Sequence, residues 1–226
     1  MPGIAERLSR VQGRVRLACG RARRDPGSII LVAVSKTRPR QDLLEAFALG
    51  LTHFGENRVQ EAAYKAEGGL PEGTVLHLVG HLQKNKARAA AGLFRWIHSV
   101  DDEELLVRLD AAAAGPIEAL AQVDLAGEPT KHGIAPAALP ALLGAASGLR
   151  QVRLVGLMCL PPYFADPERA RPFFRRLCAL RDELGGAERL PHLSMGMSHD
   201  FEVAVEEGAT LLRVGEAIFG RRGIAA

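Results

Sequence analysis

The segment Ile29-Ile30-Leu31-Val32-Ala33-Val34-Ser35-Lys36 is an apolar, β-branched run that predicts a buried strand. The turn residues Thr37-Arg38 and a helical pattern over Pro39–Leu49 follow it directly. A buried strand that leads into an amphipathic helix is typical of a parallel βαβ unit. A doubly wound nucleotide-binding sheet is the alternative, but its first turn is rich in glycine, and this turn contains none.

The same alternation continues along the whole chain. The predicted strands are Ile29–Lys36, Thr52–Asn57, Val75–Gly80, Arg95–Val100, Ile117–Leu125, Arg153–Leu160, His192–Gly196 and Thr210–Gly215. The helical patterns are Pro39–Leu49, Arg58–Ala66, Lys84–Ala91, Asp102–Ala113, Pro136–Ala146, Pro167–Leu184 and His199–Glu207, and a short helix follows Gly215. Eight strands that alternate with eight helices favour an α/β fold of the closed (β/α)₈, TIM-like type over an open sheet.

An additional helix precedes the predicted barrel. Apolar residues with helical spacing occupy the first 24 residues, namely Ile4, Leu8, Val11, Val15 and Ala18. The barrel is expected over residues 29–222. Because such barrels need roughly 200 to 250 residues, the 226 residues of the chain predict one domain, residues 1–226.

Composition narrows the class of protein. Hydrophobic residues make up 47% and charged residues 24% of the chain, as in soluble globular proteins. Cys19, Cys159 and Cys178 show no paired spacing, which argues against disulfides and favours the cytoplasm. No apolar run is long enough for a signal peptide or a membrane span. The net charge is only +3, and one arginine-rich helix predicts a solvated face rather than a nucleic-acid site.

Function in a parallel barrel gathers where strands end and the loops to the helices begin. Lys36 stands at the end of the first predicted strand, on the same face as Ile30, Val32 and Val34. If that face points inward, its amine lies at the mouth of an apolar funnel. Burial disfavours the ammonium form of a lysine, and the neutral amine is the species that attacks an aldehyde. A surface lysine that ends a strand is the alternative.

The last two strand ends favour an anion site. Ser198 is predicted to cap the helix His199–Glu207, where outward-pointing amides attract anions. Gly196 and Gly215 permit a close approach of the backbone to a ligand. Barrels often bind a phosphate at their last two strands, and two glycines in these positions are more specific than a single turn glycine.

Arg213 and Asn57 are the remaining polar candidates. Asn57 either supplies a hydrogen bond near the aldehyde end of a cofactor or forms a wall of the pocket. Arg213 lies two residues before Gly215, on the same face, and a buried arginine needs a partner. That partner is either a structural carboxylate or the ring nitrogen of a cofactor. His77 and His81 straddle a strand end without a carboxylate at zinc-ligand spacing, so structural roles and no metal are expected.

These strand ends resemble the pyridoxal phosphate homeostasis proteins, whose barrel is similar to that of alanine racemase. The matching blocks, which run in the right order from about Ile30 to Arg221, are Val32–Thr37, Phe54–Glu61, His77–Lys86, Gly156–Cys159, Leu193–Ser198 and Arg213–Gly220. The resemblance implies a fold-type III barrel that binds pyridoxal 5′-phosphate (PLP), with Lys36 as the Schiff-base lysine. The resemblance also implies roles for the other cofactor-binding residues: Ser198, Gly215 and the amide of Glu216 at the phosphate, Arg213 at the pyridine nitrogen, Asn57 beside the ring, and Met197 in the same shell.

Three residues depart from the family pattern. Leu76 stands where a tryptophan is common, and His199 stands where an acidic residue usually follows the serine. Glu216 replaces a more frequent threonine, and its carboxylate would repel a phosphate, so only its backbone N–H is expected to face the ligand.

The resemblance implies a protein without established turnover that takes part in vitamin B6 homeostasis, with PLP-dependent apo-enzymes as candidate recipients. A racemase or lyase is the alternative, because Lys36 supplies one acid–base group and Tyr163 is the only suitable second one; Tyr64 lies within a helix, away from the mouth. A cofactor-free phosphate-sugar barrel or a binding protein that uses the basic helix is the third reading. Racemases of this kind have a second domain that builds a dimer, so a monomer is expected here.

Overall fold

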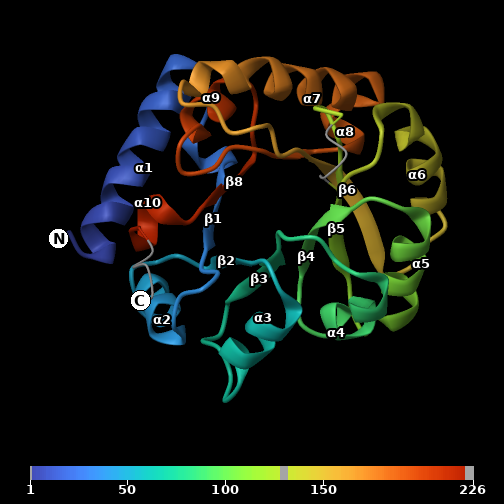
Figure 1. The fold of residues 1–226 in the computed structure, drawn as a ribbon, viewed down its shortest axis with the longest axis horizontal. Helices are drawn as coiled ribbons and strands as arrows, with labels where there is room; N and C mark the ends of the chain where they lie inside the picture. The colour runs from blue at the N-terminus through green and yellow to red at the C-terminus, as the bar shows by residue number, and fades with distance from the viewer. Residues whose placement is uncertain (1, 128–131, 222–226) are drawn as a thin grey trace.

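The computed structural model describes residues 2–127 and 132–221 and shows a closed barrel of eight parallel strands, paired in sequence order from β1 to β8. The helices surround the barrel (Figure 1). The barrel closes where β1 pairs with β8, with Ile30 opposite Leu211 and Val32 opposite Arg213. The predicted (β/α)₈ fold is therefore confirmed, whereas its predicted boundary at residue 222 lies outside the described residues.

The strands are shorter than predicted by one to three residues at most ends. They are β1 (Ile30–Val34), β2 (His53–Glu56), β3 (Val75–Leu78), β4 (Trp96–Val100), β5 (Ile117–Gln122), β6 (Val152–Met158), β7 (His192–Ser194) and β8 (Leu211–Val214). The helices are α1 (Ile4–Arg21), α2 (Arg40–Ala48), α3 (Val59–Ala66), α4 (Ala87–Ala91), α5 (Glu103–Ala112), α6 (Leu139–Ala146), α7 (Arg171–Glu183), α8 (Gly186–Arg189), α9 (Phe201–Glu206) and α10 (Glu216–Phe219). The short helix α8 was not predicted.

Alternation along each strand separates two cores. One face of the sheet packs against the helices and contributes residues such as Ala33, Phe54 and Leu212 to a large apolar layer. The other face fills the barrel with a smaller apolar cluster of Val32, Trp96, Leu120, Met158 and Leu211. Because side chains alternate, Val34, Leu160 and Arg213, each two positions beyond a member of this cluster, lie at the mouth of the barrel.

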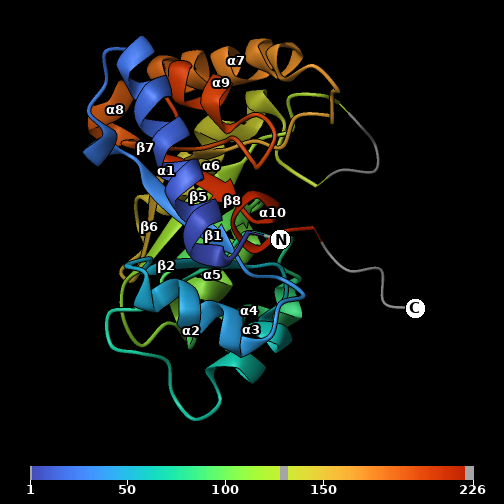
Figure 2. The same cartoon turned by 90° about the vertical axis from the view of Figure 1, so that its left-hand side faces the viewer.

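The predicted N-terminal helix is present as α1, and its buried face carries Ile4, Leu8, Val11, Val15 and Ala18 as expected. It lies beside α9 and α10 (Figure 2). Its basic side is only partly a solvated face, because Arg14 pairs with Glu202 at 2.6 Å and Arg21 pairs with Glu206 at 2.7 Å. Part of the basic charge of α1 therefore anchors it to α9.

Two further expectations concern the chain as a whole. None of the helices formed by the described residues is long and apolar enough to span a membrane. Cys19 and Cys159 are buried and Cys178 is half-buried, all three as free thiols. Burial raises the pKa of the Cys159 thiol to about 12, so this side chain behaves as a neutral packing group.

Candidate functional site

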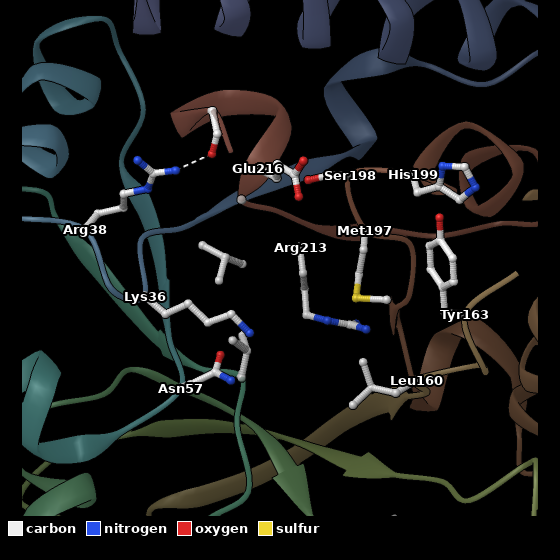
Figure 3. A pocket seen from close by; sticks show the side chains of 14 residues that line it. Lys36, Arg38, Asn57, Leu160, Tyr163, Met197, Ser198, His199, Arg213 and Glu216 are labelled. Carbon is white, nitrogen blue, oxygen red and sulfur yellow. Dashed lines mark hydrogen bonds between the residues drawn. The ribbon is translucent and has the colours of Figure 1, made fainter. Parts of the chain in front are cut away.

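A cavity of about 330 Å³ opens where the strands end and the loops to the helices begin. All seven residues that the sequence analysis assigns to cofactor binding line it: Lys36, Asn57, Met197, Ser198, Arg213, Gly215 and Glu216. Figure 3 shows the side chains of Lys36 and Arg213 pointing into it. Residues far apart in the sequence thus meet at the end of the barrel where function is expected.

Lys36 follows β1 by two residues, and a buried charged cluster fixes the backbone on both sides of it. Lys65 of α3 is 3% exposed, and its ammonium group donates to the carbonyl oxygen of Ser35 at 2.7 Å. The same group donates to Glu56 at 2.7 Å and to Glu61 at 2.8 Å, which uses all three of its N–H donors. We call Ser35, Glu56, Glu61 and Lys65 the lysine clamp.

The lysine clamp also holds the residue after Lys36. The Thr37 amide donates to Glu61, and Thr37 adopts a left-handed backbone with φ of 62°, which is strained for a residue other than glycine. On the other side, the Ser35 hydroxyl donates to Glu56 at 2.5 Å. The clamp therefore holds a strained turn that directs the Lys36 side chain into the cavity.

Burial dominates the electrostatics of the clamp. Desolvation raises the pKa of Glu56, and the hydrogen bonds from Lys65 and Ser35 oppose it only in part. Burial also acts to raise the pKa of Glu61, but hydrogen bonds from Lys65 and the Thr37 amide lower it overall. This cluster was not predicted from the sequence, although a glutamate and a lysine four residues apart on one helix are a recognisable pair.

Arg213 lies one pleat below Gly215, as predicted, and it is 4% exposed. Its guanidinium group donates to the Ser194 hydroxyl at 2.6 Å and to the Cys159 carbonyl oxygen at 2.9 Å. Within residues 2–127 and 132–221 it forms no ion pair with a carboxylate, and burial lowers its pKa, although the nearby Asp200 acts in the opposite direction. Of the two predicted partners, the structural carboxylate is therefore ruled out among the described residues.

The predicted capping role of Ser198 is wrong. The helix α9 begins at Phe201, with Asp200 as its N-cap residue. Gly196 has φ of 88°, and the Met197 amide donates to the Asp200 carboxylate at 2.7 Å, so residues 197–200 form a turn before the helix. The Ser198 hydroxyl instead accepts from the amide of Ala217 at 3.1 Å, and so joins this turn to α10.

The remaining predicted residues, Gly215, Glu216 and Asn57, line the same cavity. Gly215 packs tightly, because a Cβ atom there would lie 2.9 Å from the Val34 carbonyl oxygen. The Glu216 side chain is 61% exposed and accepts from Arg221 at 3.2 Å, which agrees with a carboxylate that is turned toward solvent. Asn57 is held from behind, since a Cβ atom at Gly80 would lie 2.4 Å from the Asn57 carbonyl oxygen.

Several cavity residues were not assigned to cofactor binding from the sequence. Arg38 lines the cavity and donates to the Gly220 carbonyl oxygen (Figure 3), which joins the loop after β1 to the end of α10. Leu160, Tyr163 and His199 line the opposite side of the mouth. Tyr163 is 80% exposed, and its ring lies 5.4 Å from that of His199. Loop geometry brings these residues together, and the strand pattern does not specify it.

His77 and His81, for which structural roles are predicted, lie in two different parts of the barrel. His77 is fully buried inside the barrel. His81 lies near Asp101 and His132, whose possible ligand atoms all fall within 4.8 Å of one another. The rings of His81 and His132 stack at 3.5 Å with only 6° between their planes. The lone pairs of the two rings therefore lie in parallel planes and do not converge on one point, an arrangement that differs from a tetrahedral metal site.

Comparison with known proteins agrees with this geometry. The family model of the alanine racemase N-terminal domain matches residues 14–223. The pyridoxal phosphate homeostasis protein of Aquifex aeolicus is 44% identical over 96% of this chain and 97% of its own length. The protein of the same name from Pseudomonas aeruginosa is 42% identical over 98% and 97%. The chain belongs to the pyridoxal phosphate homeostasis protein family.

Two solved structures are similar in fold to this chain. PipY of Synechococcus elongatus, solved with PLP bound, is 40% identical, with a TM-score of 0.83 over 96% of this chain and all of its own. Alanine racemase from Corynebacterium glutamicum shares the fold at 18% identity, with a TM-score of 0.66 over 95% of this chain and 61% of its own. The fold of this chain therefore matches a part of the racemase rather than the whole of it.

Proposed function

We propose that this protein holds PLP as a Schiff base on Lys36 and takes part in vitamin B6 homeostasis without catalytic turnover. The observation that carries the proposal is that one cavity gathers Lys36, Arg213 and the backbone around Gly215. The bound cofactor of PipY and the names of the curated relatives support the choice of ligand.

The residues present fit this cofactor. Arg213 is a buried cation without a carboxylate partner among the described residues, and the ring nitrogen of a pyridine is a suitable acceptor for it. Ser198, Gly215 and the amide of Glu216 lie together at the start of α10, where a phosphate would meet backbone donors. When bound, PLP supplies an aldehyde that a lysine amine captures reversibly.

Each residue that lines the cavity has its own role in binding. The lysine clamp orients Lys36, and Arg213 faces the ring from the inner end of the cavity. Asn57, held by its contact with Gly80, forms one wall, and Met197 forms another. Glu216 keeps its carboxylate toward solvent, so that its charge lies away from the phosphate.

A spectroscopic experiment tests the proposal. The purified protein loaded with PLP is expected to show the visible absorbance of a Schiff base, and borohydride reduction followed by peptide mapping is expected to place the label on Lys36. Lys36→Ala abolishes the band. Lys84→Ala removes an exposed lysine outside the cavity, which pairs with Glu104, and is the matched control that keeps the band. A Lys36→Ala protein that retains the full band contradicts the proposal.

A racemase or lyase is the second candidate, and one observation favours it. Tyr163 lines the same cavity as Lys36 and carries a phenol hydroxyl group at the mouth. Its high exposure argues against a proton-transfer role, because acid–base groups act best where water is excluded. Exchange of the α-proton of amino acids in D₂O decides the question. Exchange that disappears in both Lys36→Ala and Tyr163→Phe establishes turnover, and no exchange with any amino acid removes this candidate.

The domain organisation, the oligomeric state, the location and the recipients of PLP form the finer part of the proposal. We propose that residues 1–226 form one PLP-binding domain, monomeric and cytoplasmic, that passes PLP to PLP-dependent apo-enzymes. Size-exclusion chromatography with light scattering tests the monomer. Transfer is tested by mixing the loaded protein with an apo-enzyme in the presence of a scavenger of free PLP. Reactivation despite the scavenger supports direct delivery, and its complete loss contradicts it.

A further inference from the structure

A column of polar side chains crosses the interior of the barrel and ends on Arg213. His53 Nδ1 lies 2.8 Å from His77 Nε2, and His77 Nδ1 lies 2.9 Å from His98 Nε2. His98 Nδ1 lies 2.8 Å from the Ser194 hydroxyl, which accepts from Arg213 at 2.6 Å. We call His53, His77, His98 and Ser194 the histidine ladder. It begins at the first residue of β2, at the opposite end of the barrel from the cavity.

The contacts of Ser194 fix the direction of every hydrogen bond in the ladder. The Ser194 hydroxyl accepts from Arg213, and its own proton has a single other partner within the described residues, His98 Nδ1. The hydroxyl must therefore donate to His98, because the opposite arrangement leaves a buried hydroxyl proton unpaired. His98 then donates from Nε2 to His77, and His77 donates from Nε2 to His53. All three rings are thus neutral Nε2–H tautomers.

Burial keeps the ladder neutral. His77 and His98 are fully buried, and desolvation holds the pKa of each well below its usual value, with neighbouring charges acting in the same direction. Burial also lowers the pKa of His53, which is half-buried. Trp96 stacks on His77 with ring centroids 5.4 Å apart and closes the apolar surroundings of the column.

The direction of the bonds has an electrostatic consequence for Arg213. Each group in the ladder turns its lone pair toward the guanidinium and its proton away from it. The aligned dipoles stabilise a buried positive charge without a carboxylate, and chains of hydrogen bonds polarise one another in this way. A carboxylate partner would compete with a ligand for the guanidinium, whereas a neutral chain leaves its charge available to the cavity.

We propose that the histidine ladder is the positioning device that aims Arg213, in its charged form, at the pyridine nitrogen of the cofactor. This inference rests on the proposed function and extends it to residues that never touch the ligand. His98 and Ser194 act on the cofactor through Arg213, and His53 and His77 keep His98 in the tautomer that accepts from Ser194.

The direction of the ladder is tested first, without cofactor. Nitrogen-15 NMR of histidine-labelled, PLP-free protein at pH 8 is expected to show His53, His77 and His98 as Nε2–H tautomers, with assignments from single substitutions. An Nδ1–H tautomer at His77 or His98 overturns the inference. Because no PLP is present, this result stands whether or not Lys36 proves to be the Schiff-base residue.

The effect on the cofactor is tested with His98→Gln. We expect the Schiff-base band to remain and the affinity for PLP to fall about 10- to 100-fold, because Arg213 is then poorly oriented for its charged hydrogen bond to the cofactor. The nitrogen-15 shift of the ring nitrogen in labelled PLP is expected to move as well, a change that a loss of packing alone does not produce. His192→Gln is the matched control, because His192 contacts Trp96 but lies outside the ladder.

Ser194→Ala provides a second variant if His98→Gln fails to fold. It removes the hydroxyl between Arg213 and His98 and is expected to give the same change in affinity and ring-nitrogen shift. Unchanged affinity and an unchanged ring-nitrogen shift in a folded variant overturn the inference, while the band on Lys36 leaves the proposed function intact. A change of equal size in His192→Gln also overturns it, because the effect would then not depend on the ladder.

Discussion

The two sides of the cavity are held by opposite kinds of interaction. On the β1–β2 side, the lysine clamp fixes the backbone around Lys36 with a buried ammonium group and two carboxylates. On the β7–β8 side, neutral groups hold Arg213, namely the Ser194 hydroxyl, the Cys159 carbonyl oxygen and the histidines behind them. Charged groups thus hold the proposed attachment point of PLP, Lys36, and dipoles hold Arg213, which is proposed to recognise the ring.

This difference predicts that the lysine clamp mainly affects the stability of the fold, whereas the histidine ladder mainly affects recognition of the ligand. Charges in the clamp depend on each other, because removal of one leaves the others buried without compensation. The ladder contains no charge of its own, so the loss of one rung mainly affects the orientation of Arg213. The clamp side should therefore respond to substitution through stability, and the ladder side should respond through binding and pH.

The largest expected effect is at the centre of the clamp. Lys65→Met keeps the length of the side chain but removes the ammonium group and leaves Glu56, which is 0% exposed, without its cation. We expect a loss of about 3–5 kcal/mol in the free energy of unfolding, measured by urea denaturation. The reference is Arg10→Ala, in a pair with Glu6 that is more than 60% exposed on both sides, with an expected loss below about 1 kcal/mol. Similar losses in the two variants contradict the proposed role of the clamp.

An intermediate effect is expected where the two sides meet, at the contact of β8 with β1. Gly215→Ala places a methyl group 2.9 Å from the Val34 carbonyl oxygen and must push the two strand ends apart. We expect a loss of about 1–3 kcal/mol together with weaker PLP binding, measured by denaturation and absorbance titration. Gly144→Ala is the control, because the added methyl group meets no atom within 4 Å and lies in a helix. It is expected to stabilise the protein by about 0.5–1 kcal/mol; a loss at Gly144 comparable to that at Gly215 removes the steric explanation.

The smallest expected effect is the pH dependence of the ladder side. The folded protein holds the pKa of His77 well below 6.5, so the unfolded chain binds more protons once the pH falls below about 6.5. The stability contributed by neutral His77 is therefore complete above that pH and is lost as the pH falls. His77→Phe is expected to reduce the slope of unfolding free energy against pH by up to about 1.4 kcal/mol per pH unit, measured by urea denaturation between pH 8 and pH 5.5. Equal slopes for the two proteins contradict a neutral, buried His77.

Side-chain alternation explains why part of the site was predictable. Lys36 and Arg213 each lie at the end of a strand whose inward positions are visible in the sequence, and both side chains line the cavity. The order of eight strands followed from the alternation of patterns, and the barrel confirms it. The roles of the seven assigned residues toward PLP stay predictions.

The histidine ladder was not predictable, because it depends on the register between neighbouring strands. His53, His77 and His98 lie on three strands, and only the register, with Gly55 beside His77 and His77 beside Trp96, brings their rings together. The capping role of Ser198 failed for a related reason, since the sequence pattern of a cap does not reveal that Asp200 and Gly196 close a turn first. Local patterns fix which face a residue takes, whereas its partners depend on the stagger of neighbouring strands.

The anchoring of α10 has a consequence for the order of events during synthesis. Arg7 of α1 donates to the carbonyl oxygens of Ile218 at 2.8 Å and Phe219 at 3.3 Å, so the earliest helix holds the latest one. Residues 30–34 leave the ribosome long before residues 211–219. Until the latter arrive, β1 lacks its neighbour β8, and the proposed phosphate end of the cavity does not exist. If Lys36 binds PLP as proposed, a nascent chain carries this lysine for most of its translation without being able to retain the cofactor, and capture must follow the emergence of β8 and α10.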